Sequence, residues 1–365
     1  MVVVVVISLI AILMANLESR GQMKNGMFYG FFLVTLLGCI HYNYGNDYMG
    51  YYSTYKEINI IPLRWDYLAG DAYNIEPGWV VLNHLFSHFG GFFMMVAVLN
   101  VFQNAVYYHF IKNNVRKREW TISMIIYLMS GSLYILNFSM MRQGLAISLF
   151  VLAWSFIRDK KLIQTLIIIG IASSIHYSAQ ILFPFALLPF APLGKRTVSF
   201  IYVGLLIALY FSSELLSNTF EAISAVEELK STQTLGIYAE DTEKSSYGLG
   251  FVINLLPFVI SIWGLFMRNE NLNNEKKMLI MISMVSFLIA PFGQIIPLLG
   301  RFGMYFSAYD VAVIPFIYSL LPNKKYYQIF MGVYIFILVY SYYMFFHSPV
   351  WAKSYSTFHT IFEIL

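Results

Sequence analysis

The chain has 365 residues, of which 59% are hydrophobic, 18% aromatic and only 12% charged, with a formal net charge of +4. A soluble globular protein carries about 25% charged residues, so this composition excludes a soluble enzyme, a disordered chain and a nucleic-acid binder. The apolar runs are continuous instead of alternating in segments of about ten residues, which excludes a β-barrel. An all-α, polytopic transmembrane helical bundle remains.

Apolar segments follow one another along most of the chain. A helix that crosses a bilayer needs about 20 mostly apolar residues, and by this measure we predict about twelve spans in a single integral membrane domain, residues 1–365. The first span could instead be a cleaved signal peptide, but the lack of basic residues before its core favours a retained helix. In chain order the predicted spans are Val2–Ala15, Met27–Ile40, Phe92–Ile111, Trp120–Leu136, Gly144–Ile157, Leu162–Ile175, Ile181–Leu193, Val198–Phe211, Phe251–Met267, Met278–Ile296, Phe302–Leu321 and Tyr326–Phe346.

Lysine and arginine gather in alternate connections between these spans. Basic residues mark cytoplasmic loops, so the connections that hold them are predicted to face the cytoplasm. The long loops His41–Trp79 and Ser212–Gly250 and the tail His347–Leu365 then lie outside. The predicted cytoplasmic residues are Arg20, Lys24, Lys112, Arg116, Lys117, Arg118, Arg158, Lys160, Lys161, Lys195, Arg196, Arg268, Lys276, Lys277, Lys324 and Lys325.

One apolar segment, Pro77–Phe89, does not fit the alternation of sides. Counting it as a span would reverse every later loop and remove the charge bias, so we predict a short re-entrant or interfacial helix on the outer side. Irregular backbone at membrane depth must line protein or a wet cavity. This segment is therefore a candidate part of a functional site.

Two outer turns each carry an arginine, Arg142 and Arg301, against the general bias of basic residues toward the inside. A guanidinium group can bind phosphate oxygens in a bidentate fork. The alternative is that each side chain reaches out to lipid headgroups. Two such arginines, on a face with few basic residues, favour anion binding.

Three histidines lie near the outer side. His176 ends a span and could act as a base near neutral pH, or it could cap carbonyl groups at a helix end. His84 and His88 have the i, i+4 spacing of metal ligands, but no third ligand accompanies them, so a polar helix face is the favoured interpretation.

The outer loops hold most of the acidic residues and many tyrosines. Asp47 and Glu76 lie closest to the membrane ends of the first loop and are candidate bases, while the tyrosines are either sugar-stacking faces or ordinary interfacial residues. The second loop reads as an amphipathic helix that could form a lid. Asp310 lies within a span, where a carboxylate is either functional or bonded to a tyrosine.

Several short motifs in these outer segments resemble one family. Together they are similar to the EpsG-like branch of the Wzy-type polysaccharide polymerases, in order from Asp47 to Arg301, whereas the second outer loop and the C-terminal tail carry no matching motif. The motifs are Asn46-Asp47-Tyr48, Glu76-Pro77-Gly78-Trp79 with Asn83, Asn137-Phe138, Met141-Arg142-Gln143-Gly144-Leu145-Ala146, Ala172-Ser173-Ser174-Ile175-His176-Tyr177-Ser178-Ala179 and Gly300-Arg301-Phe302.

The resemblance implies a membrane glycosyltransferase similar to the GT-C type, in a bacterial inner or plasma membrane. Such enzymes build O-antigen, capsule or exopolysaccharide by moving a growing glycan from undecaprenyl pyrophosphate to a sugar hydroxyl of an incoming lipid-linked unit, on the periplasmic or outer side. The implied partners are this lipid-linked oligosaccharide and membrane lipid, with a chain-length regulator left open and no nucleic acid.

Under this resemblance, each candidate residue takes a role without a metal or cofactor. Arg142, Arg301 and Gln143 would hold the pyrophosphate. The base or orienting group would be His176, Asp47 or Glu76, which the sequence does not rank. The expected sugar-binding residues are Tyr48, Tyr51, Asn83, Asn137 and Tyr177.

Two other functions stay open. A lipid-linked oligosaccharide flippase or other transporter would spread polar residues along a path through the membrane, whereas here they gather at one face. A ligase or acyltransferase of the same compartment would differ in its product.

Overall fold

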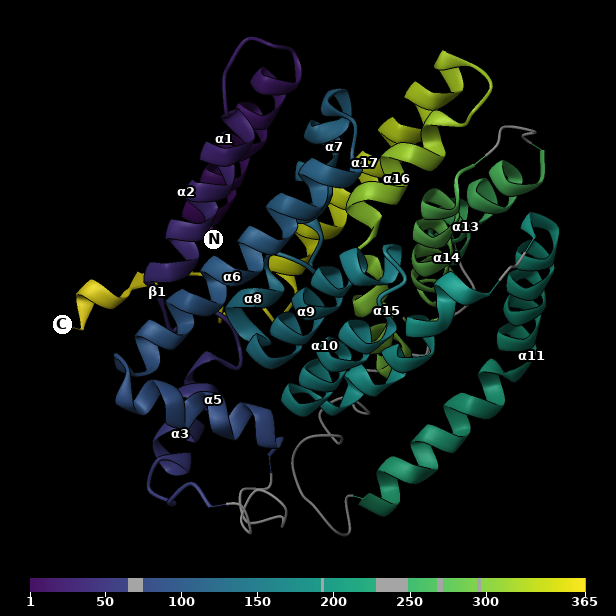
Figure 1. Ribbon diagram of the computed structural model, residues 1–365. Helices are drawn as coiled ribbons and strands as arrows, with labels where there is room; N and C mark the ends of the chain where they lie inside the picture. The colour runs from purple at the N-terminus through teal and green to yellow at the C-terminus, as the bar shows by residue number, and fades with distance from the viewer. Residues whose placement is uncertain (65–74, 192–193, 228–248, 268–271, 294–296, 365) are drawn as a thin grey trace. The chain divides into compact units, whose positions relative to one another are not determined.

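The computed structural model describes residues 1–64, 75–191, 194–227, 249–267, 272–293 and 297–364, and it is helical almost throughout (Figure 1). Within these residues the strands are β1 (His41–Tyr42) and β2 (His359–Thr360), which pair antiparallel. The predicted helical class is therefore confirmed for the described part of the chain.

The chain divides into two compact units, which we describe separately. The first combines residues 1–189 with 322–365, and the second comprises residues 190–321. The first unit contains β1, β2 and the helices α1 (Val2–Ser19), α2 (Gly26–Ile40), α3 (Tyr48–Ile58), α5 (Pro77–His88), α6 (Gly91–Asn114), η1 (Lys117–Glu119), α7 (Trp120–Met129), α8 (Leu136–Ser139), α9 (Met141–Arg158), α10 (Leu162–Ile175), η2 (Tyr177–Phe190, whose last residue opens the second unit), α17 (Lys324–His347) and η3 (Ile361–Glu363). The second contains α11 (Lys195–Glu227), α13 (Leu249–Met267), α14 (Asn274–Ile289), α15 (Pro297–Ser307) and α16 (Asp310–Ser319).

Three helices among the described residues, α1, α6 and α17, are long and apolar enough to cross a membrane by length and composition. Several predicted spans differ from the observed helices. The predicted span Trp120–Leu136 ends early, because the α-helix α7 stops at Met129 and Ser130 is extended. The predicted span Ile181–Leu193 falls largely in the 3₁₀ helix η2 instead of an α-helix.

The cause of the second difference is visible in the sequence of η2. Pro184 and Pro189 lie inside it, and proline lacks the N–H group that an α-helix interior requires.

The predicted span Phe302–Leu321 is also not continuous, since α15 ends at Ser307 and α16 begins at Asp310. Apolar composition alone did not reveal these interruptions.

The segment that we expected to form a short outer helix is α5. Pro77 occupies its first turn, where the fixed φ of proline suits a helix start and its missing N–H is not needed. Gly90 and Gly91 then adopt φ values of +85° and +78°, which glycine tolerates best. They separate α5 from α6, so the short helix is confirmed as an element distinct from the span that follows.

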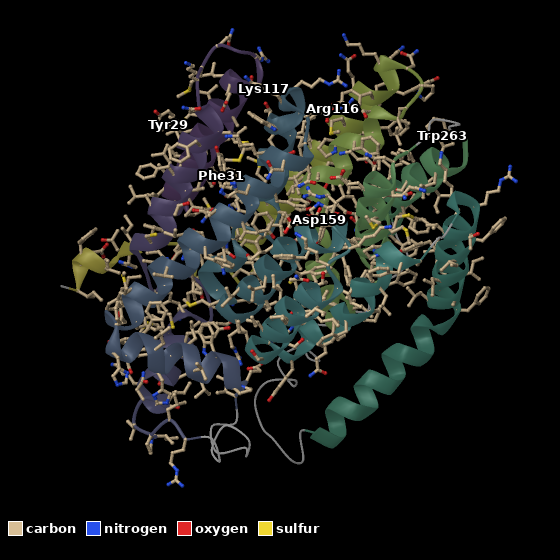
Figure 2. All side chains as sticks on the ribbon, viewed as in Figure 1. Tyr29, Phe31, Arg116, Lys117, Asp159 and Trp263 are labelled. Carbon is tan, nitrogen blue, oxygen red and sulfur yellow. The ribbon has the colours of Figure 1, made fainter. Side chains whose placement is uncertain are left out.

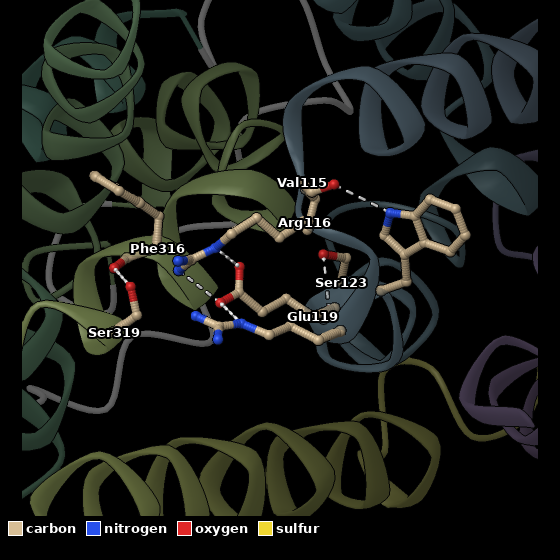
Figure 3. A network of polar contacts seen from close by, with 8 residues as sticks. Val115, Arg116, Glu119, Ser123, Phe316 and Ser319 are labelled. Carbon is tan, nitrogen blue, oxygen red and sulfur yellow. Dashed lines mark hydrogen bonds and ion pairs between the residues drawn. The ribbon is translucent and has the colours of Figure 1, made fainter. Parts of the chain in front are cut away.

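Basic residues gather at one end of the first unit. Ser19 at the end of α1 lies 3.2 Å from Thr121 at the start of α7, between their hydroxyl oxygens. In the adjacent turn, Arg116 pairs with Glu119 at 2.7 Å (Figure 3). Figure 2 shows Arg116 and Lys117 at the end that holds the α1–α2 turn, and Figure 1 shows α3 and α5 at the opposite end.

One close approach places α5 against α10, which pairs with α9. The connection from α9 to α10 is short, so the two helices form an antiparallel hairpin. The start of α5 rests on the end of α10 at Gly78, where a Cβ atom would lie 2.8 Å from the backbone C and O of Ser174. Glycine is therefore required at this position by the packing of α5 on α10.

We expect Gly78→Ala to destabilise the protein by about 1–3 kcal/mol, because the added methyl group meets backbone that cannot rotate away. Gly50→Ala is the matched control, since a Cβ at Gly50 in α3 meets nothing within 4 Å. Thermal unfolding of both variants in detergent measures the difference. Equal stability of the two variants would show that α5 does not rest on α10 in this way.

Candidate functional site

Three residues that we predicted separately meet at one end of the first unit. Glu76 precedes α5, Arg142 lies in the first turn of α9, and His176 follows α10. The Glu76 carboxylate pairs through Oε2 with Nη1 of Arg142, and its Oε1 lies 3.0 Å from Nδ1 of His176. The backbone N–H of Tyr177 also points to Oε1, at 3.4 Å. One carboxylate thus joins a guanidinium and an imidazole.

The fold explains how residues so far apart in the chain come together. In the antiparallel α9–α10 hairpin, the start of α9 and the end of α10 lie at the same end, which places Arg142 near His176. The close approach at Gly78 then brings the start of α5, and with it Glu76, onto the end of α10. The motif Glu76-Pro77-Gly78 therefore supplies the carboxylate, the helix start and the contact.

Burial differs among the three side chains. The side chain of Glu76 is 7% exposed, whereas those of Arg142 and His176 are 27% and 22% exposed. Burial raises the pKa of Glu76, but the hydrogen bond from His176 and the charge of Arg142 outweigh it and lower the pKa to about 2. At neutral pH the buried carboxylate is therefore ionised, while parts of the Arg142 and His176 side chains remain exposed.

One aromatic residue, Tyr51, lies against Arg142, and a second one, Trp79, packs behind it. Its Cζ atom lies 5.7 Å from the centre of the Tyr51 ring, and Arg142 also hydrogen-bonds Tyr51 through its side chain and backbone. Tyr51 packs edge-on against Trp79 with the ring centres 5.5 Å apart, and Trp79 has no exposed surface. Tyr51, which we expected to bind sugar, therefore contacts the arginine and helps to fix its guanidinium.

The other predicted sugar-binding residues divide by exposure. Tyr48 has no exposed surface, and its hydroxyl donates to the carbonyl of His41. Asn83 is fully buried and donates to the carbonyl of Trp79, and Asn137 is 4% exposed. Tyr177 is 56% exposed directly beside His176. In this structure Tyr177 offers a ring to a ligand, whereas Tyr48, Asn83 and Asn137 pack inside.

Three other predicted residues are Asp47, Gln143 and Arg301. Asp47 is exposed at the start of α3, where its backbone N–H donates to the hydroxyl of Ser139 at 3.2 Å. Gln143 is 1% exposed and points into the packing of α9. Arg301 lies on α15 in the second unit, whereas all the contacts around Glu76 lie within the first.

Among the described residues, no group of three or more His, Cys, Asp or Glu side chains could hold a metal ion. Nδ1 of His88 donates to the carbonyl of His84 within α5 itself, at 2.9 Å. Asp310 in the second unit accepts a hydrogen bond at 3.2 Å from Ser286, so its partners include a serine and not the tyrosine that we considered.

Trp79 belongs to the motif Glu76-Pro77-Gly78-Trp79, but we predicted no role for it. Its position could have been inferred from helical spacing, because Trp79 follows Glu76 by three residues and so lies near it on the same side of α5. The partner Tyr51 could not be inferred, because it comes from a different helix.

The comparisons with known proteins agree with the resemblance noted in the sequence. No curated protein and no solved structure matches the chain. A family model, that of the EpsG family, matches residues 26–359. This match covers Glu76, Arg142 and His176 together with most of the chain, and it carries a polymerase-like role in polysaccharide biosynthesis. The chain therefore belongs to the EpsG family.

Proposed function

We propose that this protein is a Wzy-type glycosyltransferase that polymerises lipid-linked repeat units on the outer side of a bacterial inner or plasma membrane. The observation that carries the proposal is the carboxylate of Glu76, which holds a cation and a histidine side by side. Transfer from a sugar pyrophosphate needs a cation for the leaving group and at most a base for the acceptor.

In this proposal His176 is the base and Glu76 is a positioning residue. Because Nδ1 of His176 faces Glu76, the proton on Nδ1 is held by the carboxylate and Nε2 is the nitrogen that accepts a proton. Glu76 itself is a poor base, since its pKa is about 2. Asp47 is exposed nearby and could orient the acceptor sugar.

The proposed reaction is a single displacement at the anomeric carbon of the growing glycan. The acceptor hydroxyl oxygen bonds to that carbon, and the bond from the carbon to the phosphate oxygen breaks. Undecaprenyl pyrophosphate leaves with the bonding electrons, and the hydroxyl proton passes to Nε2 of His176. Each new bond thus lengthens the glycan by one repeat unit.

Arg142 would bind the leaving pyrophosphate. Glu76 and Tyr51 occupy only part of the five-donor guanidinium, and the side chain is 27% exposed. A cation at the start of a helix is unfavourable for the helix itself, whereas an anion there is favourable. The start of α9 therefore suits a phosphate beside Arg142. Arg301 and Gln143 remain proposed pyrophosphate ligands.

The sugars would contact the exposed ring of Tyr177, which lies one residue from the proposed base. Tyr51 would line the same region while it holds Arg142. Tyr48, Asn83 and Asn137 would support the site from inside, because they have little or no exposed surface. The lipid-linked oligosaccharide and membrane lipid are the proposed partners, and a chain-length regulator remains an open one.

A transporter is the main alternative from another class. Buried amides do lie along α6, but they bond to neighbouring helices: Asn104 accepts from Tyr127 at 2.9 Å, and Asn114 accepts from Trp154 at 2.9 Å. Such bonds stabilise helix packing within a membrane. Purified protein with lipid-linked repeats in detergent separates the two functions, because polymer formation there requires an enzyme. Product analysis separates a polymerase from a ligase or acyltransferase.

We expect Arg142→Ala to lower polymer formation by about a hundredfold or more, the size of effect seen when one charge-stabilising donor is lost. Cells should then accumulate single lipid-linked repeats and lose long chains. Arg142→Lys should fail as well, because lysine lacks the planar fork. Gel ladders of the polysaccharide give the measurement, normalised to the amount of protein in the membrane.

Arg158→Ala is the matched control for Arg142→Ala, since Arg158 lies at the other end of α9 and pairs with Asp159. Its ladder should resemble that of the wild type. Normal chain ladders in Arg142→Ala, at normal protein levels, would rule out the proposed role of Arg142.

The lowered pKa of Glu76 predicts a pH dependence of stability. A carboxylate whose pKa falls from 4.5 to about 2 on folding stabilises the protein fully above pH 4.5, and this stabilisation is lost as the pH falls toward 2. The difference in melting temperature between the wild type and Glu76→Gln should therefore be constant at pH 5–8 and shrink below pH 4.5. Thermal unfolding in detergent across this range tests it. A difference that already shrinks between pH 7 and 5 would contradict the shift.

A further inference from the structure

The C-terminal tail, residues 348–364, folds back onto the first outer loop. Its strand β2 pairs with β1, with His41 opposite Thr360 and Tyr42 opposite His359. Next to this strand pair, the backbone N–H of Gly45 donates to the carbonyl of Ser354 at 3.1 Å. Figure 1 shows the tail in yellow beside β1. The tail is thus tied to the segment that leads into α3.

Tyr355 anchors the tail in the interior of the first unit. It is 1% exposed, and its ring centre lies 4.9 Å from that of Tyr44 and 5.1 Å from that of Phe345. Tyr44 in turn packs edge-on against Phe138 of α8 at 5.3 Å. The tail, the first outer loop and α8 therefore share one aromatic cluster.

One buried hydroxyl group lies where these three segments meet. Ser139, the last residue of α8, is 2% exposed. Its hydroxyl accepts the backbone N–H of Asp47 at 3.2 Å, and the hydroxyl of Tyr355 lies beside it. A buried hydroxyl that pairs with a distant segment fixes that segment relative to its own helix, since leaving the partner unpaired is costly.

The backbone of the first outer loop lies tightly against the backbone of α8 next to Ser139. Gly45 has φ +113°, and a Cβ atom there would lie 2.5 Å from the carbonyl oxygen of Phe138. The outer loop therefore presses against α8 at a position that only glycine can occupy.

The tail reaches the proposed site through two short connections. Asp47 lies four residues before Tyr51, one turn away in α3, and Ser139 lies three residues before Arg142. Because Tyr51 contacts Arg142, the Ser139 hydroxyl and its neighbour Tyr355 lie close along the chain to the contact that holds the guanidinium.

We propose that the hydroxyl groups of Tyr355 and Ser139 pair, that the C-terminal tail is thereby a positioning element of the site, and that these two positioning residues lock α3 to α8 and so hold Tyr51 against Arg142. The functional part of this inference rests on the proposed function. The lock itself is a property of the fold and can be measured without any assay of activity.

The first test measures the lock by hydrogen–deuterium exchange of the full-length protein in detergent. Tyr355→Phe removes only the hydroxyl and keeps the ring. Amides of α3 should then exchange about five- to tenfold faster, the size expected for one lost hydrogen bond. Tyr342→Phe is the control, since Tyr342 is also buried but its hydroxyl lies beside Ser8 of α1. Unchanged exchange in α3 of Tyr355→Phe, or an equal rise in Tyr342→Phe, would overturn the lock.

Ser139→Ala gives a second route to the same bond. It should raise α3 exchange at least as much as Tyr355→Phe, and the double variant should be no worse than Ser139→Ala alone, because the bond is already absent. Additive effects of the two substitutions would overturn the link between Tyr355 and Ser139.

The kinetic test uses a lipid-linked repeat as donor. Tyr355→Phe should raise KM for the donor about five- to tenfold and leave kcat within about twofold, because a loosely held Arg142 weakens binding of the pyrophosphate. Tyr342→Phe should retain the wild-type KM. An unchanged KM beside faster α3 exchange would overturn positioning of Arg142 but leave the lock. If Arg142→Ala were fully active, the proposed function would fail instead.

Discussion

The buried carboxylate of Glu76 is the constraint on which the site depends. An ionised carboxylate loses its hydration when it is buried, and that cost must be offset by charged and hydrogen-bonding partners. Arg142, His176 and the N–H of Tyr177 supply them. Because these partners come from two other helix ends, the ionised carboxylate can be buried without a large cost only when α5, α9 and α10 are assembled. The same contacts thus form the site and hold these three helices together.

In the proposed reaction, this shared carboxylate also couples two chemical roles. It contacts the imidazole and the guanidinium at once, so the proposed base for the acceptor and the proposed cation for the leaving group would keep a constant separation. Tyr51, which packs on Trp79, lies against Arg142, and in the proposed lock the tail holds α3 in place through Ser139. Preorganisation of this kind lets fixed groups stabilise charge without rearrangement during the reaction.

Much of the site could be predicted from sequence, but the roles within it could not. An arginine on the outer side, a histidine at a span end and a carboxylate beside a short helix are each unusual enough to be noticed. Burial was harder to predict, because lipid-facing and interior positions of a membrane helix are equally apolar. The sequence therefore led us to expect sugar binding by Tyr48, Asn83 and Asn137, although packing buries these side chains. The breaks in the predicted spans were missed for a related reason, since hydropathy does not distinguish a 3₁₀ helix from an α-helix.

The sequence by itself determined the helical membrane class, the gathering of basic residues in alternate connections and the membership of the family, because these depend on composition and on local motifs. Only the tertiary structure decided that Glu76 meets Arg142, 66 residues away, and His176, 100 residues away. It alone assigned Tyr51 to the arginine and brought the C-terminal tail to the first loop. Such contacts depend on the helix hairpin and on close backbone approaches at Gly78 and Gly45, which a local pattern does not specify.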